Sequence, residues 1–77
     1  MHEVSLAQHL IDLCQEAAAG QPVLSIQVRL GQGSCVAAES LQFCFEVVAR
    51  GTSAQGARLD IESATGTEFQ LVSLEVE

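Results

Sequence analysis

The chain has 77 residues, of which 48% are hydrophobic, and its mean hydropathy of +0.29 is typical of one small globular domain. Ten acidic residues against three arginines, with no lysine, give a net charge of -7, which is the wrong sign for binding nucleic acid or an anionic membrane. No apolar run approaches the length of a membrane span and no charged-then-apolar leader precedes the domain, so we expect a cytoplasmic protein.

The first predicted element is a helix that begins at a Ser5 cap, with Gln8 completing an S-x-x-Q capping box. Gly20, with the only proline close behind it, is expected to end this helix. The polar face of the helix includes His9, which we interpret as a surface residue. The apolar face recurs at three- and four-residue spacing and consists of Leu6, Leu10, Leu13, Cys14 and Ala17.

Residues 23–30, VLSIQVRL, alternate in the way that a half-buried strand does. The residues predicted to face inward are Leu24, Ile26, Val28 and Leu30. Residues 31–34, GQGS, then form a turn. Because this turn lacks both the G-x-G-x-x-G pattern and the lysine of a P-loop, nucleotide binding is not indicated.

Helical spacing returns over residues 41–48 and ends before Gly51, which occupies the position of a left-handed C-terminal residue. The apolar stripe of this second helix consists of Leu41, Cys44, Phe45 and Val48, widened by Phe43 and Val47. Two further alternating segments follow, residues 57–63 (ARLDIES) and residues 67–77 (TEFQLVSLEVE). Their predicted inward residues are Leu59 and Ile61, and then Val72, Leu74 and Val76. The short segment Ala64-Thr65-Gly66 is expected to join these strands as a hairpin.

The order helix, strand, helix, strand, strand predicts a two-layer α+β fold. A strand-helix-strand unit implies a right-handed crossover with parallel strands, and the terminal hairpin adds an antiparallel strand. Because each strand alternates cleanly, only one face of the sheet is expected to be buried. We therefore predict two helices on one face of a three-stranded mixed sheet.

The cysteines do not indicate a stabilising disulfide or a structural metal site. Cys14, Cys35 and Cys44 are odd in number and form no C-x-x-C pair, so neither a disulfide framework nor a zinc site is indicated. We expect all three to be small, buried, reduced thiols. Both histidines lie within the first nine residues and no set of side chains is arranged for making bonds, so we do not expect an enzyme.

His2 stands out because of its position beside the chain terminus. The Met1 amine, the amide nitrogen of residue 2 and the His2 imidazole can close two fused chelate rings, with Glu3 as a fourth donor. Planar sets of nitrogen and oxygen ligands suit Ni(II) or Cu(II), whereas zinc prefers tetrahedral sites. The alternative interpretation is an exposed, frayed terminus without a ligand role.

Five segments carry a resemblance that covers nearly the whole chain: MHEVSLA, VRLG, ESLQFCFEVVARGT, GARLDIE and EFQLVSLEVE. In this order they resemble the nickel-binding domain of the HypA/HybF hydrogenase nickel-incorporation family, whose members are metallochaperones. The resemblance implies that His2 is a ligand of Ni(II), supported by the Met1 amine and Glu3. It also implies two partners, a HypB-type maturation GTPase and the [NiFe]-hydrogenase large-subunit precursor, with urease as the target in some organisms.

The family also carries a zinc domain with two C-x-x-C pairs between its last two strands, where this sequence has only Ser63-Ala64-Thr65-Gly66-Thr67. We therefore expect residues 1–77 to form a single nickel-binding domain without zinc, in which a short turn at 63–67 replaces the zinc domain. Two alternatives stay open. The chain could be an interaction module that docks a maturation GTPase or apo-enzyme without metal, and a free sheet edge could support a homodimer.

Overall fold

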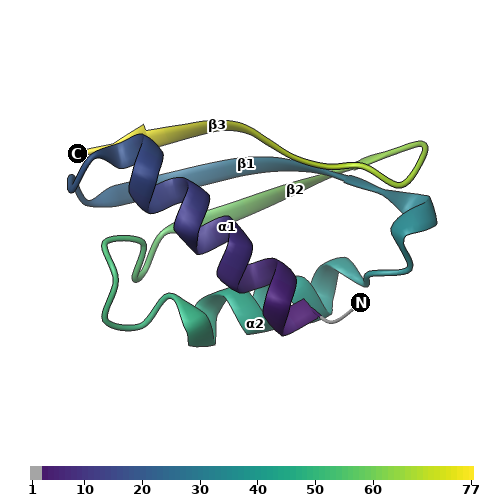
Figure 1. The fold of residues 1–77 in the computed structure, drawn as a ribbon, viewed down its shortest axis with the longest axis horizontal. Coiled ribbons are helices and arrows are strands. Elements are labelled where there is room, and N and C mark those ends of the chain that lie inside the picture. The colour runs from purple at the N-terminus through teal and green to yellow at the C-terminus, as the bar shows by residue number, and fades with distance from the viewer. Residues whose placement is uncertain (1–2) are drawn as a thin grey trace.

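The computed structural model describes residues 3–77, in which two α-helices lie on one face of a three-stranded sheet (Figure 1). The elements in chain order are α1 (Glu3–Ala18), β1 (Val23–Gly31), the short 3-10 helix η1 (Gln32–Ser34), α2 (Ala38–Val48), β2 (Arg58–Ala64) and β3 (Phe69–Val76). The predicted two-layer α+β fold is confirmed. Neither α1 nor α2, the α-helices of residues 3–77, is long and apolar enough to cross a bilayer.

β1 is the central strand of the sheet, parallel to β2 and antiparallel to β3. The predicted hairpin between the last two strands is therefore wrong, because β2 and β3 lie on opposite sides of β1 (Figure 1). A short connection does not by itself specify a hairpin. Strands two places apart in a sheet are about 10 Å from each other, and a segment as short as residues 65–68 also spans that distance.

The connection from β2 to β3 crosses directly over the end of β1. The Gly31 N–H donates to the Glu68 carbonyl at 2.7 Å, and the Gly33 N–H donates to the Gly66 carbonyl at 2.8 Å. A Cβ on Gly31 would lie only 2.7 Å from the Gly66 carbonyl carbon and 2.9 Å from the Glu68 nitrogen. Gly31 has a φ of -69°, which any residue adopts. Glycine is therefore required here by the close approach of two backbones.

The core fills the space between the helices and the sheet. Its fully buried larger members are Leu10, Ile11, Cys14, Ile26, Val28 and Leu41, which come from both helices and the central strand. The predicted apolar face of α1 is partly wrong, since Ala17 is exposed while Ile11 and Ala18 are buried. Ser5 is not a cap, because α1 already includes Glu3, and the Gln8 amide instead donates to Asp12 Oδ1 at 3.0 Å.

The apolar stripe of α2 is narrower than its sequence indicates. Leu41 and Phe45 are buried, as predicted, and Val48 is half-buried. Phe43 and Val47 were expected to widen this stripe, but they are 68% and 41% exposed. They lie one helical turn apart on the outer side of α2, because a helix that packs against one layer buries only one stripe.

Two β-bulges change the alternation that was predicted for β1 and β3. The ladder between these strands shifts register at Leu24 and again at Val72, where one strand contributes an extra residue. Both residues were predicted to face the core, and they are instead 51% and 42% exposed. On β3 the bulge reverses which positions face the helices. The half-buried apolar residues are Phe69 and Leu71 before the bulge, and Leu74 and Val76 after it.

Candidate metal site at the start of the first helix

Of the three predicted nickel ligands, Glu3 is the one within the described residues, while Met1 and His2 lie outside them. Glu3 is the first residue of α1 and is half-buried. A carboxylate in the first turn of a helix is stabilised by the positive end of the helix dipole. The start of α1 lies close to α2, against which α1 packs (Figure 1).

The beginning of α1 also leaves backbone nitrogen atoms free for other partners. The first four N–H groups of an α-helix have no acceptor within the helix, and the N–H of Glu3 is one of them. Such an amide can give up its proton to a metal ion without breaking a helical hydrogen bond. The fold is therefore compatible with an amide nitrogen of Glu3 acting as a metal ligand.

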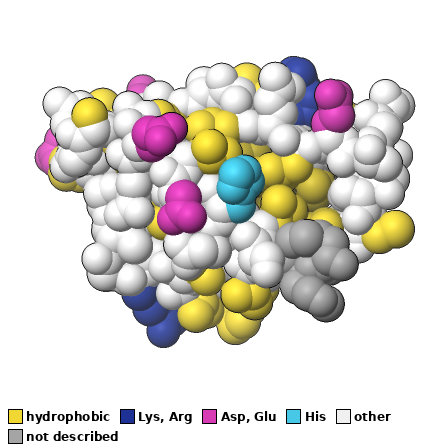
Figure 2. All heavy atoms as spheres, viewed as in Figure 1, with side chains coloured by type: hydrophobic (Ala, Val, Ile, Leu, Met, Phe, Trp, Pro, Cys, Tyr) yellow, Lys and Arg dark blue, Asp and Glu magenta, His cyan; other side chains and the backbone are white. Residues whose placement is uncertain are grey.

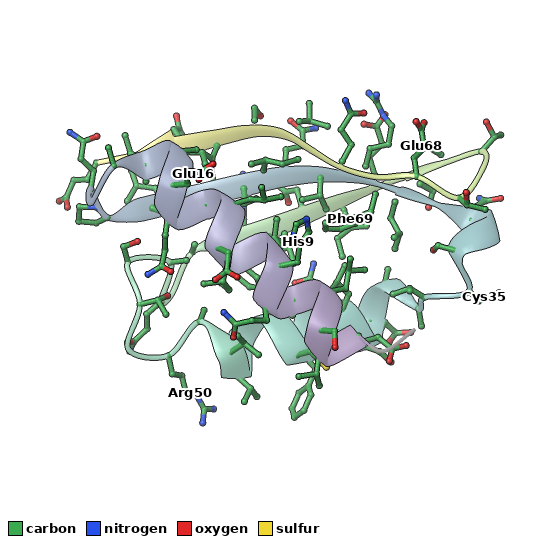
Figure 3. All side chains as sticks on the ribbon, in the orientation of Figure 1. His9, Glu16, Cys35, Arg50, Glu68 and Phe69 are labelled. Atoms are coloured by element: carbon green, nitrogen blue, oxygen red, sulfur yellow. The ribbon has the colours of Figure 1, made fainter. Side chains whose placement is uncertain are left out.

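The described side chains do not assemble a metal site elsewhere. No group of three or more His, Cys, Asp or Glu that could hold a metal ion occurs within residues 3–77. His9 is exposed on α1, as predicted (Figures 2 and 3). His9 follows Glu3 by six positions. On an α-helix this separates the two residues by about 9 Å along the axis and places their side chains on different sides of the helix. The fold does not bring His9 and Glu3 together.

The three cysteines occupy three different environments. Cys14 is buried, Cys44 is half-buried and Cys35 is exposed, and all three are free thiols. The prediction that all are buried is therefore wrong for Cys35, which has a left-handed φ of 62° in the loop between η1 and α2. Burial raises the pKa of the Cys14 thiol to about 11. Cys14 is therefore protonated at neutral pH and is a packing residue.

This burial predicts how stability depends on alkaline pH. The folded-state pKa of Cys14, about 11, lies above its ordinary value of 9.0, so its stabilising effect is constant below pH 9 and is lost between about pH 9 and 11. The free energy of unfolding should fall by about 2 kcal/mol between pH 8 and 10.5. Urea titrations at both pH values measure this change, and the sequence has no lysine or tyrosine that would titrate in the same range.

The matched control for this measurement is Cys14→Ala, which keeps a small apolar residue in the core but has no thiol to titrate. It should lower stability at pH 8 and remove most of the difference between the two pH values, so the variant's deficit relative to the original chain should shrink or reverse at pH 10.5. An equal difference in the original chain and in Cys14→Ala would contradict the assignment to Cys14.

The face of the sheet opposite the helices is polar and carries two ion pairs. The Arg29 guanidinium lies 3.5 Å from the Glu62 carboxylate, and the Arg58 guanidinium lies 3.3 Å from the Asp60 carboxylate. All four side chains are exposed enough that each pair contributes little to stability. These pairs affect the distribution of charge instead. Two of the three arginines of the sequence, Arg29 and Arg58, are paired with carboxylates on the sheet.

A candidate chelate at Met1, His2 and Glu3, where the first helix of a two-layer α+β domain begins, is expected of a protein that carries a metal ion. Comparison with known proteins supports that class. A family described as "Hydrogenase/urease nickel incorporation, metallochaperone, hypA" matches residues 1–76. The chain belongs to the HypA family, which is one of nickel metallochaperones and maturation factors rather than enzymes.

Individual relatives agree with this assignment. Hydrogenase maturation factor HypA of Geobacter sulfurreducens is 39% identical over 66 residues, and that of Azotobacter chroococcum is 44% identical over 74 residues. These alignments cover 86% and 92% of this chain, but only 60% and 66% of the relatives. The chain thus spans about 60% of the length of its Geobacter relatives.

A solved structure supports the fold independently. The solution structure of the Ni metallochaperone HypA from Helicobacter pylori superimposes with a TM-score of 0.83 at 21% sequence identity, covering 99% of this chain and 97% of that chain. At this identity the similarity establishes the arrangement of helices and strands.

Proposed function

We propose that this domain is a nickel metallochaperone that binds Ni(II) through Met1, His2 and Glu3 and delivers it for maturation of [NiFe]-hydrogenase or urease. The observation that carries the proposal is the match of residues 1–76 to the nickel-incorporation family, a range that includes the Met-His-Glu segment. Nickel is therefore the cargo of the domain rather than a resident cofactor.

The chemistry of the donor set supports nickel as the cargo. The Met1 amine, the His2 amide nitrogen and the His2 imidazole supply three nitrogens in one plane, and the Glu3 amide or carboxylate supplies the fourth donor. This planar set matches the tetragonal preference of Ni(II). The positive end of the α1 dipole favours the negative charge of a deprotonated amide and of the Glu3 carboxylate.

The proposal extends to the setting in which the domain works. We propose delivery in the cytoplasm with a HypB-type GTPase and the hydrogenase large-subunit precursor as partners. We also propose that residues 1–77 act as one domain without zinc, with the short segment 63–67 in place of a zinc domain. The direct connection between the two edge strands supports this. Residues 65–68 link β2 to β3, and Gly66 and Glu68 accept hydrogen bonds from the chain at the end of β1.

Nickel titration of the chain with a free Met1 amine tests the proposal. At neutral pH we expect one equivalent of Ni(II) to bind in a diamagnetic, planar form with a visible d–d absorption band. Affinity should fall as the pH is lowered, because the amine, amide and imidazole must lose protons to bind the metal. A paramagnetic complex, or binding that is unchanged at acidic pH, would overturn the planar nitrogen set.

The second candidate function is a protein-interaction module that docks a maturation GTPase or apo-enzyme without metal. The observation in its favour is the exposure of Phe43 and Val47, which stand one turn apart on the outer side of α2. Exposed aromatic residues of this kind are enriched among the anchors of protein interfaces. A chain with an extra residue before Met1 distinguishes the two functions. If this chain binds the GTPase as tightly as the original chain does, and added nickel changes neither affinity, the interaction module is favoured.

A further inference from the structure

The two edge strands of the sheet differ in how their outer sides are covered. On β2, the Gln42 side-chain amide of α2 donates to the Leu59 carbonyl at 2.6 Å, so the neighbouring helix contacts this strand. On β3, no side chain of residues 3–77 donates to or accepts from the strand's backbone, and no helix or loop of the described chain runs along its outer side (Figure 1). Alternate backbone N–H and C=O groups of β3 are therefore free to pair with an added strand.

The helix-facing side of β3 is also incompletely covered. Its four apolar residues are only half-buried, whereas Ile26 and Val28 of the central strand are fully buried. The reason is the position of β3 at the edge of the sheet, where no strand of residues 3–77 covers its outer side, while the main packing partner of α1 is α2. Figure 2 shows hydrophobic side chains exposed beside His9 of α1, and Figure 3 places Phe69 on that same side of the sheet. The half-buried residues are Phe69, Leu71, Leu74 and Val76.

The carboxylates of β3 and α1 have no basic residue on their own elements, and Arg29 of β1, which lies beside Gln70 of β3, is already paired with Glu62. Glu68, Glu75 and Glu77 lie on or next to β3, and Asp12 and Glu16 lie on α1. Neither element contains lysine or arginine. A second copy of the chain paired through β3 would bring these acidic groups together, which is unfavourable. Charge complementarity therefore selects a basic partner.

We propose that the outer edge of β3 is the docking site for an extended, basic segment of a partner protein, which pairs with β3 as a fourth strand. Apolar side chains on one side of that segment would cover the half-buried row of β3, while lysine or arginine on its other side would approach Glu75. The bulge at Val72 interrupts the edge, so pairing is limited to a few residues on either side of it. This docking does not depend on nickel.

The test uses the nickel-free chain and the peptide Ac-KVKVKVK-NH2. In ¹⁵N NMR spectra, we expect chemical-shift changes concentrated at residues 69–76. Two further peptides carry N-methyl groups on alternate residues, so that each is blocked along one of its two edges. Because one peptide edge faces β3, one of these peptides should bind and the other should bind at least about tenfold more weakly.

Charge reversal gives the matched comparison. Glu68→Lys with Glu75→Lys should weaken binding of the lysine peptide by about tenfold. Glu39→Lys with Glu46→Lys makes the same change in net charge on exposed positions of α2 and should bind normally. The proposal is overturned if both double variants lose affinity equally, if both N-methylated peptides bind alike, or if the shift changes fall around Phe43. Self-association of the chain through β3 at the same concentrations would equally overturn it, because the edge would then serve a second copy.

Discussion

Replacing His2 by alanine is expected to abolish planar binding of Ni(II). The imidazole closes one of the two fused chelate rings, so its loss removes a donor and a ring together. The remaining amine and amide cannot hold the metal in a nitrogen plane at neutral pH, because deprotonation of the amide depends on the anchoring donors beside it. Nickel titration followed by the d–d band and by magnetic susceptibility measures the effect.

A chain extended by one residue before Met1 tests the same site without changing any side chain. It moves the free amine away from the His2 chelate, so the planar complex should be lost again. His9→Ala is the matched control, since His9 is exposed on α1 (Figure 3) and is about 9 Å from Glu3 along the helix axis. Persistence of the same d–d band in both His2→Ala and the extended chain would refute the ligand set, and its loss in His9→Ala would move the site.

Substitution of Gly31 by alanine is expected to be the most damaging single-methyl change in the fold. The new Cβ would meet the backbone of Gly66 and Glu68 at less than 3.0 Å, and backbone cannot rotate aside as a side chain can. The crossover would have to lift off β1 and break the hydrogen bonds that Gly31 and Gly33 donate to it. We expect a loss of about 3 kcal/mol or more in the free energy of unfolding, at the upper end of the effects of overpacking.

Gly20→Ala is the control for this measurement, because it isolates the other cost of replacing glycine. Gly20 has a φ of +90° and open space around its Cβ position, so its replacement strains the backbone without a collision. That strain costs about 1–2 kcal/mol. Urea unfolding of both variants should therefore rank Gly31→Ala as the less stable. An equal or smaller loss at Gly31 would mean that the crossover does not press on β1.

The order and type of the helices and strands followed from the sequence because period and turn residues are local properties. Alternation over 23–30 predicted β1, and the three- and four-residue spacing around Leu41 and Phe45 predicted α2. The strand order did not follow, since a short connection at residues 65–68 fits both a hairpin and a crossover. The exposure of Leu24 and Val72 was missed for a related reason: a bulge is a property of two paired strands, and the period of one strand does not contain it.

The candidate sites also divide into features that are local in the sequence and features that depend on the fold. The Met-His-Glu segment could be proposed from the sequence because its candidate ligands are consecutive and need no fold to bring them together, and because the family resemblance points to His2. The surface along β3 could not be found in this way, since it combines an unpaired strand edge with a row of half-buried apolar side chains. The one available signal was the absence of basic residues from residues 3–18 and 68–77.

The crossing of residues 65–68 over β1 has a mechanical consequence. A force applied to this segment along the strands acts on β2 and β3 together, and it loads the hydrogen bonds on both sides of β1 in shear. A hairpin at the same place would leave its two strands to be unzipped from the sheet one bond at a time. Any module grafted between Ala64 and Phe69 therefore needs ends about 10 Å apart, the spacing of strands two places removed, and its movements are transmitted to both edges of the sheet at once.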